Sequence, residues 1–126
     1  MQDEPTPTEL IKAVADFLRN ELTPQIGGHN AFKMRVAINA LDLVTRQLTL
    51  EASSDAAEAG RLTELLGLQG PLGELNRALA DRIAKGEADL QTPGLAEHLW
   101  QTTLAKLAVD QPNYAAYRRE LGSEGK

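Results

Sequence analysis

Polar side chains recur at helical spacing along residues 30–50, and they are the strongest candidates for chemistry in this sequence. This polar strip consists of Arg35, Asn39, Asp42 and Arg46. Their spacing of four, three and four residues places them within about 60° of arc on a helix. Two guanidinium groups and an amide on one line can hold a carboxylate or a phosphate. The alternative, which we favour, is structural: the arginines bridge acidic residues of neighbouring helices or face water, and Arg46 pairs with Asp42.

A second set of polar candidates flanks an apolar stripe further along the chain. Asn76 and Arg82 lie beside Leu75 and Leu79, which repeat at helical spacing. Because a partly buried amide or guanidinium needs hydrogen-bond partners, the pattern predicts a polar network between helices. Arg82 can instead extend its aliphatic stem along the apolar surface. We favour a structural role for both residues over ligand binding.

Both tyrosines of the chain, Tyr114 and Tyr117, follow Pro112, which ends a helical pattern. Tyrosine is common at interfaces because its ring packs while its hydroxyl stays hydrated. A contact with a partner is therefore one role for this pair. The role we favour is that Tyr114 packs the last segment of the chain onto the rest.

The remaining reactive residue types form no recognisable site. His29 and His98 have no cysteine to accompany them, and neither shows a metal-binding spacing. Glu97 and His98 are neighbours, so on a helix they point about 100° apart and cannot chelate one ion together. Gly27 and Gly28 lack the spacing of a phosphate-binding loop. We predict solvated histidines, no catalytic residue, no metal, no cofactor and no enzyme activity.

Composition indicates helices as the elements that position these residues. Among the 126 residues are twenty Leu and eighteen Ala, against eight Val and Ile together. Leu and Ala favour helices, whereas β-branched residues favour strands. The net charge of −5 argues against a partner such as nucleic acid or an anionic membrane. Without a long apolar run or a signal peptide, we expect a cytoplasmic protein that does not span a membrane.

The pattern predicts one helical domain over residues 1–126, with frayed ends at 1–5 and 122–126. It is a compact bundle of five main helices plus a short C-terminal helix. The first helix begins at Pro7 with Thr6 as its cap and ends at Pro24. The others are expected at 30–50, 55–66, 71–85, 93–111 and 114–121, with a linker at 51–54 and turns at Gly67 and Gly86.

The helix over residues 30–50 is expected to be the central one. Its apolar residues surround it except along the polar strip, as in a helix enclosed by neighbours. A second copy of the chain can also cover such a helix, so a homodimer is an alternative. In the fifth helix the expected buried residues are Ala96, Leu99, Trp100, Thr103, Leu104 and Leu107.

Five stretches of the chain carry a resemblance to a known family. They are residues 1–7 (MQDEPTP), 31–41 (AFKMRVAINAL), 75–77 (LNR), 82–87 (RIAKGE) and 104–114 (LAKLAVDQPNY). With these the sequence resembles, over roughly residues 1–118, a family of small bacterial proteins classed as a domain of unknown function. Members of that family tend to be encoded beside aminoglycoside-phosphotransferase-like kinases and acyl-CoA dehydrogenases. The resemblance implies a partner of one of these two kinds and supplies no catalytic residue.

Two functions follow as expectations. The first is a non-catalytic accessory protein that binds a kinase-like or acyl-CoA-metabolising enzyme. The alternative is a small-molecule or acyl-ligand binding domain in which Arg35 and Arg46 hold an anionic group. A hydrolase or transferase is the weakest hypothesis, because the acidic residues are expected on solvated faces rather than in a cleft.

Overall fold

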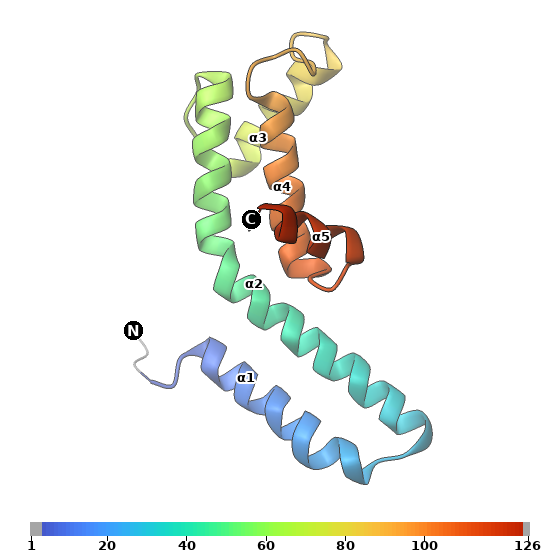
Figure 1. Ribbon diagram of the computed structural model, residues 1–126. Coiled ribbons are helices and arrows are strands. Elements are labelled where there is room, and N and C mark those ends of the chain that lie inside the picture. Colours follow the sequence, from blue (N-terminus) through green and yellow to red (C-terminus); the bar gives the residue numbers. More distant parts are fainter. Residues whose placement is uncertain (1–3, 125–126) are drawn as a thin grey trace. The chain divides into compact units, whose positions relative to one another are not determined.

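The structure, a computed structural model, describes residues 4–124, and this part of the chain is all-α with no strand. The helices are α1 (Pro7–Phe17), α2 (Gly28–Leu66), α3 (Leu72–Ala84), α4 (Leu95–Asp110) and α5 (Ala115–Glu124) (Figure 1). A π-helical turn, Leu18–Leu22, and a 3-10 turn, Thr23–Gln25, lead from α1 to α2. The predicted all-α fold class is confirmed.

Contacts within the chain separate into two units, Met1–Leu50 and Glu51–Lys126. The first, which we call the hairpin unit, contains α1 and the first part of α2. The second, the core unit, contains the rest of α2 together with α3, α4 and α5. A single domain over residues 1–126 stays a prediction.

The expected linker at residues 51–54 is wrong, because α2 runs without interruption from Gly28 to Leu66. No Gly or Pro interrupts residues 29–59. Glu and Ala are good helix formers, and a serine in a helix costs only a few tenths of a kcal/mol relative to them. The two serines of the segment are therefore too weak to end the helix. The boundary between the two units nonetheless falls at Leu50, where the sequence predicts one helix to end.

The segment 30–50 is helical as expected, but the prediction that neighbours enclose it is wrong. In the hairpin unit α1 and α2 run antiparallel (Figure 1), and the buried residues there are Ala15 and Ile38. Phe32 and Val36, expected in the core, are more than half exposed. A helix with one helical neighbour can bury only the side that faces it, which leaves the other apolar rows of α2 uncovered.

The core unit contains the main apolar core of the described chain. Its buried cluster consists of Leu62, Leu66, Leu75, Leu79, Ala88 and Leu95. The stripe expected to be buried in α3 is Leu72, Leu75, Leu79 and Ile83. Leu75 and Leu79 are confirmed, Leu72 is half-buried, and the prediction for Ile83 is wrong because this side chain near the end of the helix is 42% exposed. In α4 the expected stripe is largely wrong, because the helix buries Leu95, His98 and Leu104 and leaves Leu99 and Trp100 exposed. This helix is apolar on two sides, so periodicity alone does not reveal which side is buried.

The starts of α1 and α3 follow the predicted signals to within one residue, whereas α1 ends at Phe17, before the predicted Pro24, because a π-helical turn and a 3-10 turn follow it. The Oγ1 of Thr6 accepts a hydrogen bond from the Glu9 amide at 3.2 Å, and Pro71 caps α3. The start of α4 is two residues later than expected, at Leu95, after Gly94 with a φ of 85°. Contrary to the expected fraying at 122–126, α5 continues to Glu124. The predicted frayed positions 1–3 and 125–126 lie outside the described residues.

Candidate functional site

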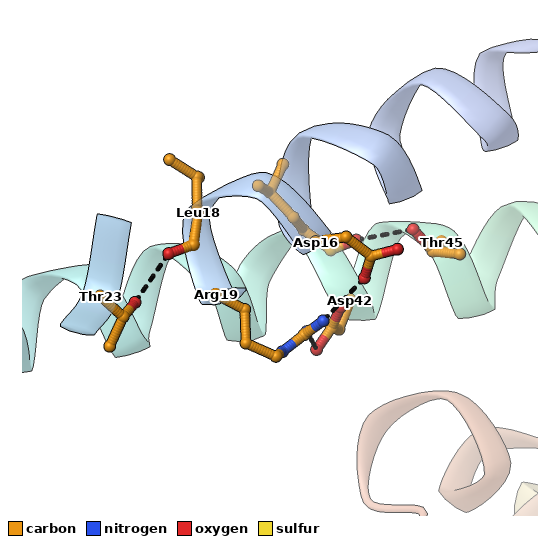
Figure 2. A network of polar contacts seen from close by, with 7 residues as sticks. Asp16, Leu18, Arg19, Thr23, Asp42 and Thr45 are labelled. Carbon is orange, nitrogen blue, oxygen red and sulfur yellow. Dashed lines mark hydrogen bonds and ion pairs between the residues drawn. The ribbon is translucent and has the colours of Figure 1, made fainter. Parts of the chain in front are cut away.

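An arginine between two aspartates organises the polar side of the hairpin unit (Figure 2). Arg19 donates from Nη1 to Asp16 at 2.9 Å and from Nη2 to Asp42 at 2.7 Å. The hydrogen bond and the charge of Asp42, with a smaller contribution from Asp16, raise the pKa of Arg19 above its usual value. One member of the polar strip, Asp42, therefore joins α2 to the turn after α1. This is the kind of interhelical bridge that the sequence favours, with the arginine supplied by the other helix.

Beside this ion pair, two further members of the polar strip line a surface cavity of about 310 Å³. Arg35 and Asn39 come from α2, and Arg19 and Thr23 come from the segment after α1, with Ile38 completing the lining. Both the backbone N–H and the hydroxyl of Thr23 donate to the Leu18 carbonyl, the hydroxyl at 2.8 Å (Figure 2). Arg46, the fourth member, does not line this cavity.

The charged groups that line this cavity are both arginines, Arg19 and Arg35. Arg19 is compensated by two carboxylates, whereas no ion pair within residues 4–124 joins Arg35 to a carboxylate. The charges of Arg19, Arg35, Asp16 and Asp42 sum to zero, but the guanidinium of Arg35 and the amide of Asn39 remain as hydrogen-bond donors on the lining of the cavity. These groups match the oxygen atoms of a phosphate or a carboxylate.

A second polar cluster, missed by the sequence analysis, lies in the core unit. Arg61 of α2 donates from Nε to Nδ1 of His98 at 3.0 Å and from Nη2 to Thr102 Oγ1 at 3.2 Å. His98 is 2% exposed, so the prediction of a solvated His98 is wrong. Burial, followed by the nearby charge of Arg61, lowers the pKa of His98 below its usual value, and Glu58 opposes that shift. Because Nδ1 accepts a hydrogen bond, the neutral imidazole carries its proton on Nε2.

This cluster borders a surface cavity of about 400 Å³ in the core unit. Its lining consists of Arg61, Glu64, Leu65, Pro93, Gly94, Glu97 and His98. One signal in the sequence could have placed His98 there. Leu95, His98 and Thr102 are spaced three and four residues apart, the spacing of one helix face. Since Leu95 is apolar, this face of α4 is a candidate for burial, and His98 belongs to it.

Asn76 and Arg82 both make hydrogen bonds to α2. Asn76 donates to Glu58 Oε2 at 2.8 Å and so links α3 to α2. Arg82 donates to the Leu66 carbonyl at 3.1 Å, which satisfies a backbone group that the end of α2 leaves free. A network between helices therefore exists at both residues, and neither lines the cavities described above.

The two tyrosines differ in burial, and the one expected to pack the last segment onto the rest is the exposed one. Tyr117, not Tyr114, is the buried residue of α5, and it lines a shallow groove together with Leu104 and Ala108 of α4. Tyr114 precedes α5 and is 54% exposed. The prediction that Tyr114 packs the last segment onto the rest is wrong, because a residue in the turn after Pro112 lies outside the face that α5 buries.

The fold and these polar clusters define an all-α protein with a helical hairpin unit and a helical core unit. The chain belongs to the family described as Domain of unknown function (DUF6285), which matches residues 24–114. The match takes in α2, α3 and α4 and leaves out α1 and α5. No curated protein and no solved structure matches the chain.

Although α2 has 39 residues, none of the helices in residues 4–124 combines the length and apolar character needed to cross a membrane.

Proposed function

We propose that this protein is a non-catalytic accessory protein that binds a partner enzyme through the outward face of α4. This outer stripe consists of Ala96, Leu99, Trp100, Thr103 and Leu107. At about 100° per residue these five positions fall within about 100° of arc, and four of them are exposed. These five are the residues of α4 whose spacing predicts burial, without Leu104, which is buried. The exposure of the outer stripe is the observation that carries the proposal.

The chemistry of the outer stripe suits a protein partner. Trp100, the only tryptophan of the chain, is 43% exposed beside Leu99. Tryptophan is among the residues that contribute most to binding at protein interfaces, usually within a rim of less important contacts. The rim is supplied by Glu97 and Lys106, whose charges flank the stripe on α4. A partner surface with an apolar pocket fits these features.

The resemblance described above implies which classes of enzyme the partner can belong to. An aminoglycoside-phosphotransferase-like kinase and an acyl-CoA dehydrogenase are the two classes to test. In this role the protein is cytoplasmic and bacterial, and it needs no cofactor, because its contribution is binding rather than chemistry.

Trp100→Ser is expected to weaken binding of the purified partner enzyme by at least about tenfold. Removing an interface tryptophan commonly costs about 2 kcal/mol or more, and about 1.4 kcal/mol corresponds to a factor of ten. Calorimetric titration of each candidate enzyme with the wild type and the variant measures the change.

The matched control is Leu90→Ser, which removes a more exposed apolar side chain outside the outer stripe. This control is expected to bind as the wild type does. Failure of the wild-type protein to bind either class of enzyme would contradict the proposal, as would equal weakening by both substitutions.

A second candidate function is the binding of a small anionic ligand by the hairpin unit. It is supported by the cavity that Arg35 and Asn39 line together, where a guanidinium and an amide offer hydrogen-bond donors. A phosphorylated metabolite or the phosphate end of an acyl-CoA has the oxygen atoms that these donors match.

Arg35→Gln is expected to abolish the stabilisation that such a ligand gives. A ligand at one hundred times its Kd stabilises the folded protein by about 2.7 kcal/mol, which raises the Tm by several degrees for a small domain. Acetyl-CoA and inorganic pyrophosphate are suitable probes, with circular dichroism at increasing temperature as the measurement. Arg46→Gln, which alters a strip residue outside the cavity, should keep the shift; absence of any shift in the wild type would exclude this function for these probes.

A further inference from the structure

We propose that two copies of this chain associate through one face of the hairpin unit, so that two hairpins form a four-helix arrangement. This hairpin face consists of Leu10, Val14 and Phe17 of α1 with Val44 and Leu48 of α2. Each of these large apolar side chains is 40–50% exposed. The proposal concerns α1 and the first part of α2, and so it is independent of the outer stripe of α4.

The ion pair between the helices shows that these residues share one face. At about 100° per residue, Leu10, Val14 and Phe17 lie on the side of α1 that points away from Arg19. By the same count, Val44 and Leu48 lie on the side of α2 that points away from Asp42. Because Arg19 and Asp42 bond to each other and the helices run antiparallel, the two sides away from that bond form a single surface of the hairpin.

Charge is sparse on the hairpin face. Around the Arg19–Asp42 bond the charged residues of both helices lie on the opposite side: Lys12, Asp16, Arg19, Asp42 and Arg46. By the same count Glu21 and Lys33, close to the turn between the helices, lie toward the hairpin face and mark its edge. In a dimer with two-fold symmetry, residues near the axis meet their own copies. A charged residue there would meet a like charge, whereas an apolar one is complementary to itself. Residues 1–50 carry five basic and six acidic side chains, so two hairpin units have little net charge to repel each other.

The hairpin unit also lacks a layer that a second copy supplies. Its buried residues are Ala15 and Ile38, which is a small core for two helices. A pair of helices becomes a stable packed layer when a second pair covers its apolar side, as in a four-helix bundle. With the half-buried Leu18 and Leu41 between the two rows, the face offers roughly 500 Å² per hairpin, or about 1,000 Å² in total. That area is at the lower end for a specific interface, which indicates a micromolar dimer.

Light scattering coupled to gel filtration tests the oligomeric state of the full chain. At about 50 µM, which exceeds a micromolar Kd, the wild type is expected at twice the monomer mass of 13.7 kDa. Val44→Glu is expected to give the monomer mass, because it places a carboxylate opposite its own copy. Val36→Glu is the matched control: it is the same substitution on the same helix, at a side chain that is 53% exposed but lies on another side of α2, and it should remain dimeric.

Three outcomes would overturn the proposal. A wild type with the monomer mass at this concentration means that no second copy covers the face. A dimer that persists in Val44→Glu, or one that Val36→Glu alone disrupts, places the interface elsewhere. Circular dichroism confirms that each variant is helical, and Val44→Ser, a milder change expected to raise the dimer Kd several-fold, gives the answer if the glutamate variant fails to fold. The partner enzyme plays no part in these measurements, so their result is independent of the role of Trp100.

Discussion

Leu62→Ala is expected to lower the free energy of unfolding of the core unit by about 3 kcal/mol. Leu62 is 0% exposed and belongs to the cluster of Leu66, Leu75, Leu79 and Leu95. Truncation to alanine removes buried methyl groups and leaves a cavity, which together cost about 2–5 kcal/mol in a well-packed site. Because stability totals only about 5–15 kcal/mol for a typical domain, this one change removes a large share of it.

Urea unfolding followed by tryptophan fluorescence measures this loss of stability in the core unit. The single tryptophan and both tyrosines belong to the core unit, so the signal reports on that unit. Leu68→Ala serves as the control, since Leu68 follows the same helix and is 45% exposed; its cost should stay below about 1 kcal/mol. Similar costs for the two substitutions would mean that Leu62 is not at the centre of the core.

Several helix boundaries can be predicted from the sequence because the signals that set them act over only a few residues. The Thr6–Glu9 pair caps α1 as predicted, Pro71 precedes α3, and Gly86 follows it with a φ of 77°. Each of these signals depends on a side chain and the backbone next to it. They therefore operate in the same way whatever the rest of the chain does.

The packing was harder to predict because it depends on partners distant in the chain. Helix α2 has apolar residues nearly all round. Such a pattern indicates that other surfaces cover the helix, but it does not identify those surfaces. Helix α4 is apolar on two sides, and the structure buries the side of Leu95 rather than that of Trp100. Val44 and Leu48 of α2 and Trp100 of α4 are among the apolar residues that are exposed where burial was predicted. These residues belong to the two proposed interaction surfaces.

The candidate sites likewise combine residues that local spacing links with residues that only contacts between helices bring together. Arg35 and Asn39 were predicted together because one helix spacing places them on one line, and the structure brings them to one cavity. Arg61 and His98 are 37 residues apart, and no local pattern links them. Arg19, which donates a hydrogen bond to the carboxylate of Asp42, likewise comes from another helical segment. Contacts between helices thus decide which polar residues meet, and only the structure contains them.

Lowering the pH from about 7 to about 5 is expected to destabilise the core unit through His98. Burial and the charge of Arg61 lower the pKa of His98 in the folded protein, while the unfolded chain keeps the usual value of about 6.5. Above pH 6.5 the imidazole is neutral in both states, and the stability is fully present. As the pH falls below 6.5, the unfolded state binds a proton more readily, so stability is lost by up to about 1.4 kcal/mol per pH unit. The main physical cause is that burial strips the charged imidazolium of its hydration, and the positive charge of Arg61 repels it as well. A protonated Nδ1 also can no longer accept the Arg61 hydrogen bond.

The two histidines of the chain allow a matched test of this pH dependence. Urea unfolding between pH 7 and pH 5, followed by tryptophan fluorescence, compares the wild type with His98→Gln and His29→Gln. Glutamine at position 98 keeps an acceptor for Arg61 but does not titrate, so the loss of stability between pH 6.5 and pH 5 should shrink markedly. His29 is exposed, and its replacement should leave the pH profile unchanged. Equal profiles for the wild type and His98→Gln would show that the protonation of His98 is not coupled to folding, and that the nearby acidic residues, Glu58, Glu64 and Glu97, compensate its charge.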